Sequence, residues 1–226
     1  MKNYLYLGLV LLLLSSCATQ SGVTRGVQYA KLYEERPVAI VVMPPINQTS
    51  HVEAKEYFYT TLYEPLCEKG YYVFSPLLTM EMFQTESAYD AELFLEGSLS
   101  QVQNVLGADA AMFTIIKSWN RNNIGGTLTA RVEYILRSTK TGETLYQREG
   151  LIKVDTGVSG SDKSLLGSLI SLAATVASTA ATDMVVAGRK CTTYVLSDMP
   201  EGKYGTLYDQ DREMAAGKSF VEATVE

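Results

Sequence analysis

The stretch Pro37-Val38-Ala39-Ile40-Val41-Val42-Met43-Pro44-Pro45 decides the fold, because it places six apolar residues in a row between prolines. A continuous apolar run rich in β-branched residues is typical of a strand covered on both faces, the usual state in a parallel sheet. Ser50-His51-Val52-Glu53 follows and has the pattern of a capping box, in which the Ser and Glu side chains bond each other's backbone amides at a helix start. The helix that it opens is predicted to bury one face, formed by Ala54, Phe58, Leu62 and Leu66.

A second strand is expected directly after this helix. Gly70 stands where a helix end favours a positive φ, and the apolar run Tyr71-Tyr72-Val73-Phe74 comes next. Strand, helix and strand then form a βαβ unit, which is expected to be right-handed. Ser75-Pro76 predicts another helix with proline at its first position, and Ser98-Leu99-Ser100-Gln101 predicts a short helix that ends near Gly107.

The rest of the domain is predicted to be a meander of strands. Residues 110–116 form another buried run, residues 128–137 alternate apolar and polar side chains, and residues 143–154 follow a turn. Alternation with a period of two predicts an antiparallel strand with one face in water. We therefore expect a single α/β domain of three-layer-like build, with the order β-α-β-α-α-β-β-β and a C-terminal amphipathic helix. Its mixed five-stranded sheet has a parallel core and an antiparallel meander at one edge.

The C-terminal amphipathic helix is predicted over residues 163–187. No charged residue occurs from Ser164 to Thr182, but the segment consists mostly of Ala, Ser, Thr and Gly, which argues against a membrane span. Its hydroxyl residues recur in steps of three and four, so they share one face. Such a small-residue face either packs on the protein's own sheet or lets a second copy or a partner approach closely. The residues concerned are Ser164, Ser168, Ser171 and Thr175.

The N-terminus has the layout of a secretory signal peptide over residues 1–16, with a basic start, an apolar middle and small residues before a cut. Its apolar run would rise about 16 Å as a helix, roughly half of the hydrocarbon thickness, and therefore does not span a bilayer. Leu14-Ser15-Ser16-Cys17 resembles the bacterial lipobox, in which the Cys thiol receives a lipid and becomes the first residue after cleavage. An ordinary signal peptide with an incidental Cys17 is the alternative. By the sorting rule for such lipoproteins, Ala18 after the cysteine favours the outer membrane.

Three segments are expected in the mature chain. A lipidated polar tether covers residues 17–35 and behaves as a flexible coil. The α/β domain with its C-terminal helix covers residues 36–190. The charged, weakly patterned residues 191–226 form a C-terminal extension with partial order.

Composition limits the chemistry that this chain is expected to perform. Its 226 residues carry 19 Lys and Arg against 25 Asp and Glu, a net charge of −6 that argues against nucleic-acid binding. It shows no zinc signature, dinucleotide fingerprint or Walker loop, and its single histidine, His51, is expected to be exposed at a helix start. We therefore expect no catalytic residue, no metal, no cofactor and no enzymatic activity.

For two further groups of residues, the sequence alone allows two interpretations each. Cys67 and Cys191 either pair as a disulfide in an oxidising compartment or remain as free buried thiols. Tyrosines are enriched at interfaces, and one group of them clusters along the chain, so this group is a candidate interface. The alternative is that these side chains line the seam between helix and sheet. The group consists of Tyr57, Tyr59, Tyr63, Tyr71 and Tyr72.

Short motifs in a fixed order connect this sequence with a known family. They are Pro44-Pro45-Ile46-Asn47, Gly70-Tyr71-Tyr72-Val73-Phe74, Gly107-Ala108-Asp109-Ala110, Thr141-Gly142-Glu143-Thr144-Leu145 and Pro200-Glu201-Gly202-Lys203-Tyr204-Gly205. With these motifs the sequence resembles a family of uncharacterised bacterial lipoproteins over most of the mature chain. Such proteins are similar in domain type to the N-terminal domain of TolB and to the curli-secretion lipoprotein CsgG. The family has no established catalytic residues to carry over.

The resemblance implies a periplasm-facing outer-membrane lipoprotein of a Gram-negative cell, with the lipid on Cys17 holding it to the membrane. We expect it to act as a non-enzymatic assembly or accessory component of an envelope or secretion complex, with protein partners or further copies of itself. It lacks the long spanning hairpins of a CsgG-like pore. The alternative is a lipid-anchored module that binds a small ligand or glycan in a cleft at the C-terminal ends of the parallel strands, near residues 44–48 and 74–76.

Overall fold

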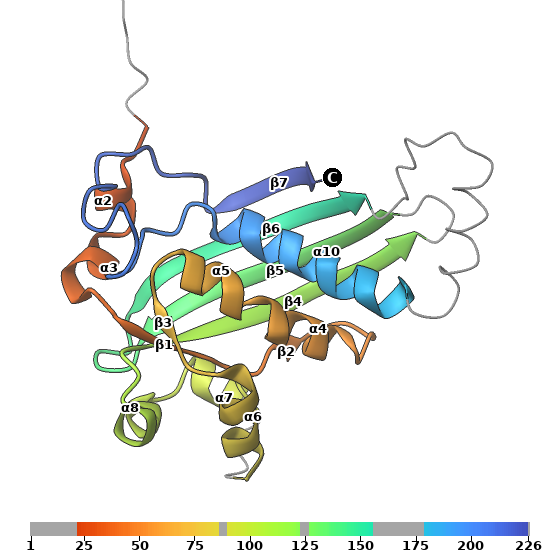
Figure 1. Cartoon of the computed structure of the whole chain (residues 1–226), viewed down its shortest axis with the longest axis horizontal. Helices are drawn as coiled ribbons and strands as arrows, with labels where there is room; N and C mark the ends of the chain where they lie inside the picture. The colour runs from red at the N-terminus through yellow and green to blue at the C-terminus, as the bar shows by residue number, and fades with distance from the viewer. Residues whose placement is uncertain (1–21, 86–89, 123–126, 156–178, 226) are drawn as a thin grey trace, which may run out of the picture.

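The computed structural model describes residues 22–85, 90–122, 127–155 and 179–225 (Figure 1). One mixed seven-stranded sheet forms its centre, with the strand order β3-β1-β4-β5-β6-β7 and with β2 beside β4. The strands are β1 (Ala39–Val42), β2 (Ile46–Asn47), β3 (Tyr72–Val73), β4 (Ala110–Asn122), β5 (Thr127–Ser138), β6 (Thr144–Asp155) and β7 (Phe220–Val225).

Strand directions follow the predicted plan of a parallel core and an antiparallel edge. β3, β1 and β4 run parallel, β4, β5 and β6 form an antiparallel meander, and β7 is parallel to β6. The expected mixed α/β domain is thereby confirmed, whereas the expected number of five strands is wrong. The two strands beyond the prediction are β2, which resumes pairing with β4 after Pro44 and Pro45, and β7 in the charged C-terminal segment.

The described helices cover both faces of the sheet at one side and a single face at the other (Figure 1). On the front face, α4 (Ala54–Thr61), α5 (Tyr63–Glu68) and α10 (Thr179–Leu196) close the larger core, in which Phe58 meets Trp119 edge-on with ring centroids 5.1 Å apart. On the back face, α6 (Pro76–Thr85), α7 (Glu92–Leu95) and α8 (Ser100–Leu106) close a smaller core around Phe113. The domain is therefore three layers thick at β1 and the first part of β4, with helices on both sides of the sheet. At β5 and β6 it is two layers thick, with described helices on one side.

The predicted helix over residues 54–66 is divided into α4 and α5 around Leu62. Pro65 explains the division, because a proline removes one amide donor and its ring clashes with the carbonyl four residues before it. Gly70 follows α5 with φ 81°, as predicted. A Cβ at Gly70 would lie 2.0 Å from the backbone nitrogen of Gly205, so this position also permits a close approach between two segments.

The two predicted capping boxes are wrong. The N-cap of α4 is Glu53, which makes no side-chain cap bond, and Asn47 orders the preceding turn instead: its Nδ2 donates to the His51 carbonyl over 2.7 Å. The N-cap of α8 is Leu99, again without a side-chain cap bond. The predicted starts and ends are more accurate than the caps, since α6 begins at Pro76 and α8 ends at Gly107 with φ 68°.

Both ends of the chain are more ordered than the sequence analysis expects. Within the segment predicted as a coil tether, α2 (Arg25–Gln28) and α3 (Ala30–Glu35) are helical. The predicted helix over residues 163–187 is described from Thr179 onward and continues to Leu196, inside the segment predicted as an extension. Residues 197–218 then fold back against α2, and β7 completes the sheet (Figure 1). Burial of side chains from these two ends against each other gives them order that their local patterning does not reveal.

Candidate functional site

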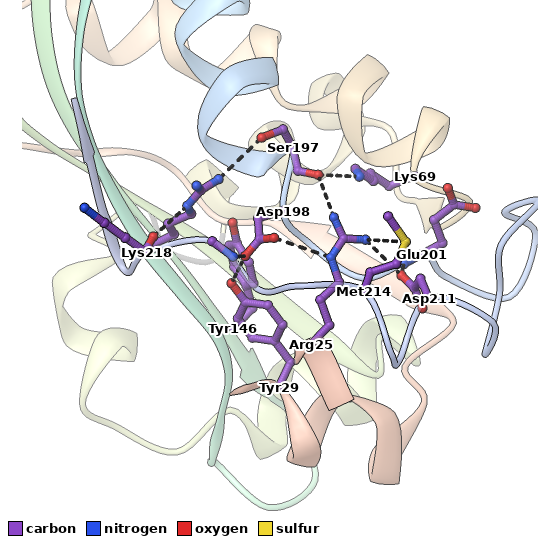
Figure 2. Close-up of polar contacts among 12 residues, drawn as sticks. Arg25, Tyr29, Lys69, Tyr146, Ser197, Asp198, Glu201, Asp211, Met214 and Lys218 are labelled. Atoms are coloured by element: carbon purple, nitrogen blue, oxygen red, sulfur yellow. Dashed lines mark hydrogen bonds and ion pairs between the residues drawn. The ribbon is translucent and has the colours of Figure 1, made fainter. Parts of the chain in front are cut away.

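A buried polar cluster joins the two ends of the chain (Figure 2). We call it the Arg25 cluster; its members are Arg25, Tyr29, Tyr33, Asp198 and Asp211. The guanidinium of Arg25, at the start of α2, lies 3.4 Å from an Asp198 oxygen through Nε and 3.3 Å from an Asp211 oxygen through Nη1. Arg25 is 9% exposed and Asp211 is fully buried, so this is an internal ion pair and not a surface one.

Neutral donors satisfy the remaining oxygens of both carboxylates. Tyr29 donates its hydroxyl to Asp198 over 2.5 Å, and Tyr33 donates its hydroxyl to Asp211 over 2.9 Å. The backbone amide of Gly217 donates to Asp198 over 2.8 Å. Burial, together with the neighbouring carboxylate, raises the pKa of both tyrosines well above the usual value, so their hydroxyls remain protonated donors.

Backbone contacts reinforce the same junction. The Arg25 amide donates to the Met214 carbonyl and the Gly26 amide donates to the Arg212 carbonyl, each over 2.9 Å. Thr24 forms an isolated bridge with Ala215. The start of α2 is therefore fixed to the C-terminal segment by main chain and side chains together.

Sequence reasoning missed this cluster. Its ion pairs join residues 173 and 186 positions apart, so no local spacing shows them. The nearest signal was the motif at residues 200–205, which the family resemblance singled out and which lies between Asp198 and Asp211. Asp198 and Asp211 flank this motif in a weakly patterned tail, and their position beside it is the signal that could have identified them.

The structure divides the predicted tyrosine group. Tyr59 and Tyr71 are each 4% exposed, and they donate their hydroxyls to the carbonyls of Pro76 and Pro200 respectively. Tyr57 packs beside Trp119 with ring centroids 6.4 Å apart. These three follow the seam alternative. Tyr63 and Tyr72 are 44% and 54% exposed, so only they are available to a partner.

Two further exposed apolar side chains lie on α6, which follows β3 in the chain. Leu77 and Leu78 are 78% and 61% exposed, whereas Thr79 of the same helix is buried and its hydroxyl lies 2.9 Å from that of Tyr59. The first turn of α6 thus exposes two leucines, although the helix buries Phe83 farther along in the usual way. β3, which carries Tyr72, lies at one edge of the sheet. We call Tyr63, Tyr72, Leu77 and Leu78 the β3-edge cluster.

The open part of the back face carries paired charges. Lys117 of β4 lies 2.8 Å from a Glu133 oxygen and 2.7 Å from a Glu149 oxygen, and Arg131 also pairs with Glu149. Partial burial alone would raise the pKa of Glu149, but the hydrogen bonds from Lys117 and Arg131 outweigh it and lower this pKa. The predicted wet face of residues 128–137 is confirmed by alternating burial along β5.

A cavity of about 440 Å³ opens where this back face meets α2. Its lining combines Glu133 and Glu149 with Gln28, Gln147 and Phe220. Phe220 holds the Arg131 guanidinium 5.7 Å from its ring centroid. Because Glu133 and Glu149 form ion pairs with Lys117 and Arg131, the cavity offers hydrogen-bonding groups without a strong net charge.

The chain segment after β1 lies at the ends of the parallel strands, where the sequence predicts a ligand cleft. Pro44 and Pro45 are buried, and β2 continues along β4 with Ile46 opposite Ile115. The chain itself therefore occupies the place where a ligand crevice would open. The back-face cavity and a smaller one beside Tyr33 and Tyr71 are lined by other residues, with neither residues 44–48 nor residues 74–76 among them.

The remaining predicted site residues carry no assembled chemistry in the described structure. Cys67 is half-buried and Cys191 is buried, and both are free thiols, which corresponds to the second alternative for this pair. His51 is exposed, as expected. Cys17, Ser164, Ser168, Ser171 and Thr175 lie outside the described residues.

The described ranges hold neither a candidate metal site nor a candidate membrane span. No three side chains of the His, Cys, Asp or Glu type come together there in a way that could hold a metal ion. Among the helices described, none has both the length and the apolar character needed to cross a bilayer.

Comparisons with known proteins place the sequence in a family context. A family profile with the description "Putative lipoprotein GNA1162-like" matches residues 27–204. The curated protein "Putative lipoprotein NMB1124/NMB1162" from Neisseria meningitidis serogroup B is 26% identical over 170 residues, which cover 74% of this chain and 77% of that relative.

Three solved structures are among those to which the structure of this chain is similar. The crystal structure of lipoprotein GNA1162 from Neisseria meningitidis has a TM-score of 0.48 and 24% identity, and the match covers 61% of this chain and 96% of that one. The PelC dodecamer from Paraburkholderia phytofirmans has a TM-score of 0.38 and 13% identity, with 74% and 91% covered. The C-terminal domain of LpoB from Escherichia coli has a TM-score of 0.33 and 14% identity, with 56% and 93% covered.

Proposed function

The chain belongs to the GNA1162-like family of lipoproteins, since the family match covers most of its length, and from this premise we propose that it is a lipid-anchored accessory protein of the cell envelope. In this proposal Cys17 carries the lipid, the body faces the periplasm from the outer membrane, and the protein works by binding a protein partner without catalysis of its own. The likeness to TolB and CsgG stays a prediction, and it is the reason for placing the partner in an envelope or secretion complex.

The single observation that carries the proposal is the β3-edge cluster. Apolar side chains of this size are usually buried, and burying a leucine contributes about 1.5–3 kcal/mol. Leu77 and Leu78 instead stand in water beside Tyr63 and Tyr72, at an edge strand. Tyrosines are enriched at protein interfaces, and exposed apolar residues mark interaction sites where they form a patch.

The Arg25 cluster supports the anchoring part of the proposal. It ties the start of α2 to the C-terminal segment, and the Val23 carbonyl already accepts the Ala216 amide of that segment over 2.8 Å. The six residue steps from Cys17 to Val23 span at most about 20 Å when fully extended. A lipid on Cys17 would therefore hold the body close to the bilayer surface, with a reach shorter than the expected tether of residues 17–35 would allow.

Photo-crosslinking in intact cells tests the partner. A photo-reactive amino acid at Leu78 is expected to crosslink to one protein species, and Leu77→Asp in the same chain is expected to abolish that product. Val105 of α8 is the matched control, because it is an equally apolar side chain that is 70% exposed outside the cluster. Recovery of uncrosslinked monomer alone, or of the same products from both positions, contradicts the proposal. Mass spectrometry of the product shows whether the partner is a second copy of the chain.

The back-face cavity favours a second candidate function, the binding of a small neutral ligand. Its volume of about 440 Å³ is in the range of ligand sites. Its paired carboxylates, its amides and the rings of Tyr29, Tyr146 and Phe220 suit a polyhydroxylated molecule such as a sugar. A thermal-shift screen with neutral saccharides tests this function, because a ligand of the folded state raises the melting temperature by mass action. The shift should disappear in Gln147→Ala and persist in Asn104→Ala, an exposed amide on α8. No shift with any saccharide, or an equal shift in both variants, contradicts it.

A further inference from the structure

One end of the molecule gathers exposed apolar side chains that neither the β3-edge cluster nor the cavity uses. Val23 and Val27, before and within α2, are 52% and 71% exposed. In the C-terminal segment, Tyr204, Leu207 and Met214 are 66%, 41% and 44% exposed. We call these five residues the anchor-end surface.

Backbone contacts join the two segments that carry these side chains. Thr24 bridges Ala215, and the Met214 carbonyl accepts the Arg25 amide over 2.9 Å. α2 and residues 197–218 lie together at one end of the sheet, opposite the end at which β6 stops and α10 begins (Figure 1). The Arg25 cluster holds this end together from inside (Figure 2).

The short distance along the sequence from Cys17 to Val23 limits how far this surface can lie from a lipid on Cys17. Only six residue steps separate Val23 from Cys17, and they span at most about 20 Å. If Cys17 is lipidated, as proposed above, the junction cannot move farther than that from the lipid. The headgroups of the bilayer are therefore within reach of this surface.

We propose that the anchor-end surface docks on the phospholipid bilayer and fixes the orientation of the body on the membrane. Its valine, leucine and methionine side chains enter the boundary between headgroups and acyl chains, where Tyr204 offers the ring and hydroxyl that suit a half-wet environment. Charge plays little part, because the exposed Lys203 and Lys218 are accompanied by the exposed Glu213. In this orientation α6 lies on the side of the molecule away from α2 (Figure 1).

Quenching by brominated lipids tests the contact in the lipidated, full mature protein. Val27→Trp and Leu207→Trp each introduce a reporter into the surface, and Leu77→Trp on α6 is the matched control, since Leu77 is also highly exposed. The native Trp119 is 2% exposed, and its emission, measured in the chain without an added tryptophan, is subtracted from every sample. The proteins are reconstituted in vesicles of phosphatidylethanolamine and phosphatidylglycerol, with and without brominated phosphatidylcholine.

The expected result is a loss of reporter fluorescence of about twofold or more at positions 27 and 207, with little change at position 77, because the bromines lie at the depth that interfacial side chains reach. Equal quenching at all three positions, or none at positions 27 and 207, overturns the inference. Flotation of the vesicles separates this outcome from a failure of the anchor. Protein that floats without quenching refutes only the docking surface, whereas protein that does not float refutes the lipid anchor and the surface with it.

Discussion

Removal of the Arg25 guanidinium is the sharpest probe of how the two ends of the chain are held. In Arg25→Ala, Asp198 and the fully buried Asp211 lose their cationic partner but keep hydrogen bonds from Tyr29, Tyr33 and backbone amides. Breaking a buried ion pair by deleting one member costs about 3–5 kcal/mol. The low end of that range is expected here, about 3 kcal/mol, because neutral donors remain and the two ion-pair distances are 3.3 and 3.4 Å.

Urea unfolding measures this loss as a lower midpoint with an unchanged slope. Chymotrypsin provides a local readout, since release of α2 and α3 exposes Tyr29 and Tyr33 to cleavage. Lys31→Ala is the matched control: it removes a cation from the neighbouring helix whose pair with Glu143 is about half exposed, and it should change stability by about 1 kcal/mol or less. The reasoning is refuted if Arg25→Ala behaves like this control and gains no cleavage at the two tyrosines.

Two further predictions concern ionisable groups. The hydrogen bonds to Asp109 from Lys140 and two amides outweigh its partial burial and lower its pKa, so its stabilisation is present above the ordinary carboxyl pKa and is lost as the pH falls through the lowered value. Urea unfolding should show Asp109→Ala about 2 kcal/mol less stable than the native chain at pH 7, and this gap should narrow towards pH 3, whereas a constant gap would refute the assignment. Burial raises the pKa of Cys191 to about 12, so iodoacetamide should modify it only after unfolding, while the half-buried Cys67 reacts earlier. Without reductant, mass spectrometry of the unfolded protein should show both alkylated, and a product with neither alkylated would establish a disulfide instead.

The sequence is informative where periodicity is strong. The apolar run before Pro44 became the buried strand β1, and the alternation over residues 128–137 became β5 with one wet face. Pro76 and Gly107 marked helix ends correctly, because proline and glycine restrict or release φ whatever surrounds them.

Tertiary packing decided the elements that the sequence analysis missed. β4 was expected to end at residue 116, but it continues to Asn122 through a bulge between Ile116 and Ser118. The bulge changes which side chains face the front, and Trp119 thereby enters the core beside Phe58. No local pattern announces such a change of register.

The candidate sites were the least predictable part. Among the five clustered tyrosines, only contacts with distant segments decide that Tyr71 is buried against Pro200 while its neighbour Tyr72 is exposed. The Arg25 cluster depends in the same way on residues from opposite ends of the chain. Sequence spacing measures neither kind of contact.

The attachment of lipid to Cys17 tests the account most directly. Intact-mass measurement and membrane fractionation of the native chain and of Cys17→Ser, both expressed in a Gram-negative cell, decide it. The account predicts that the native chain carries the added mass of a lipid after loss of residues 1–16 and sediments with membranes, and that Cys17→Ser carries no lipid and leaves the membrane fraction. A Cys17→Ser protein that matures to the same mass and still sediments with membranes would contradict it.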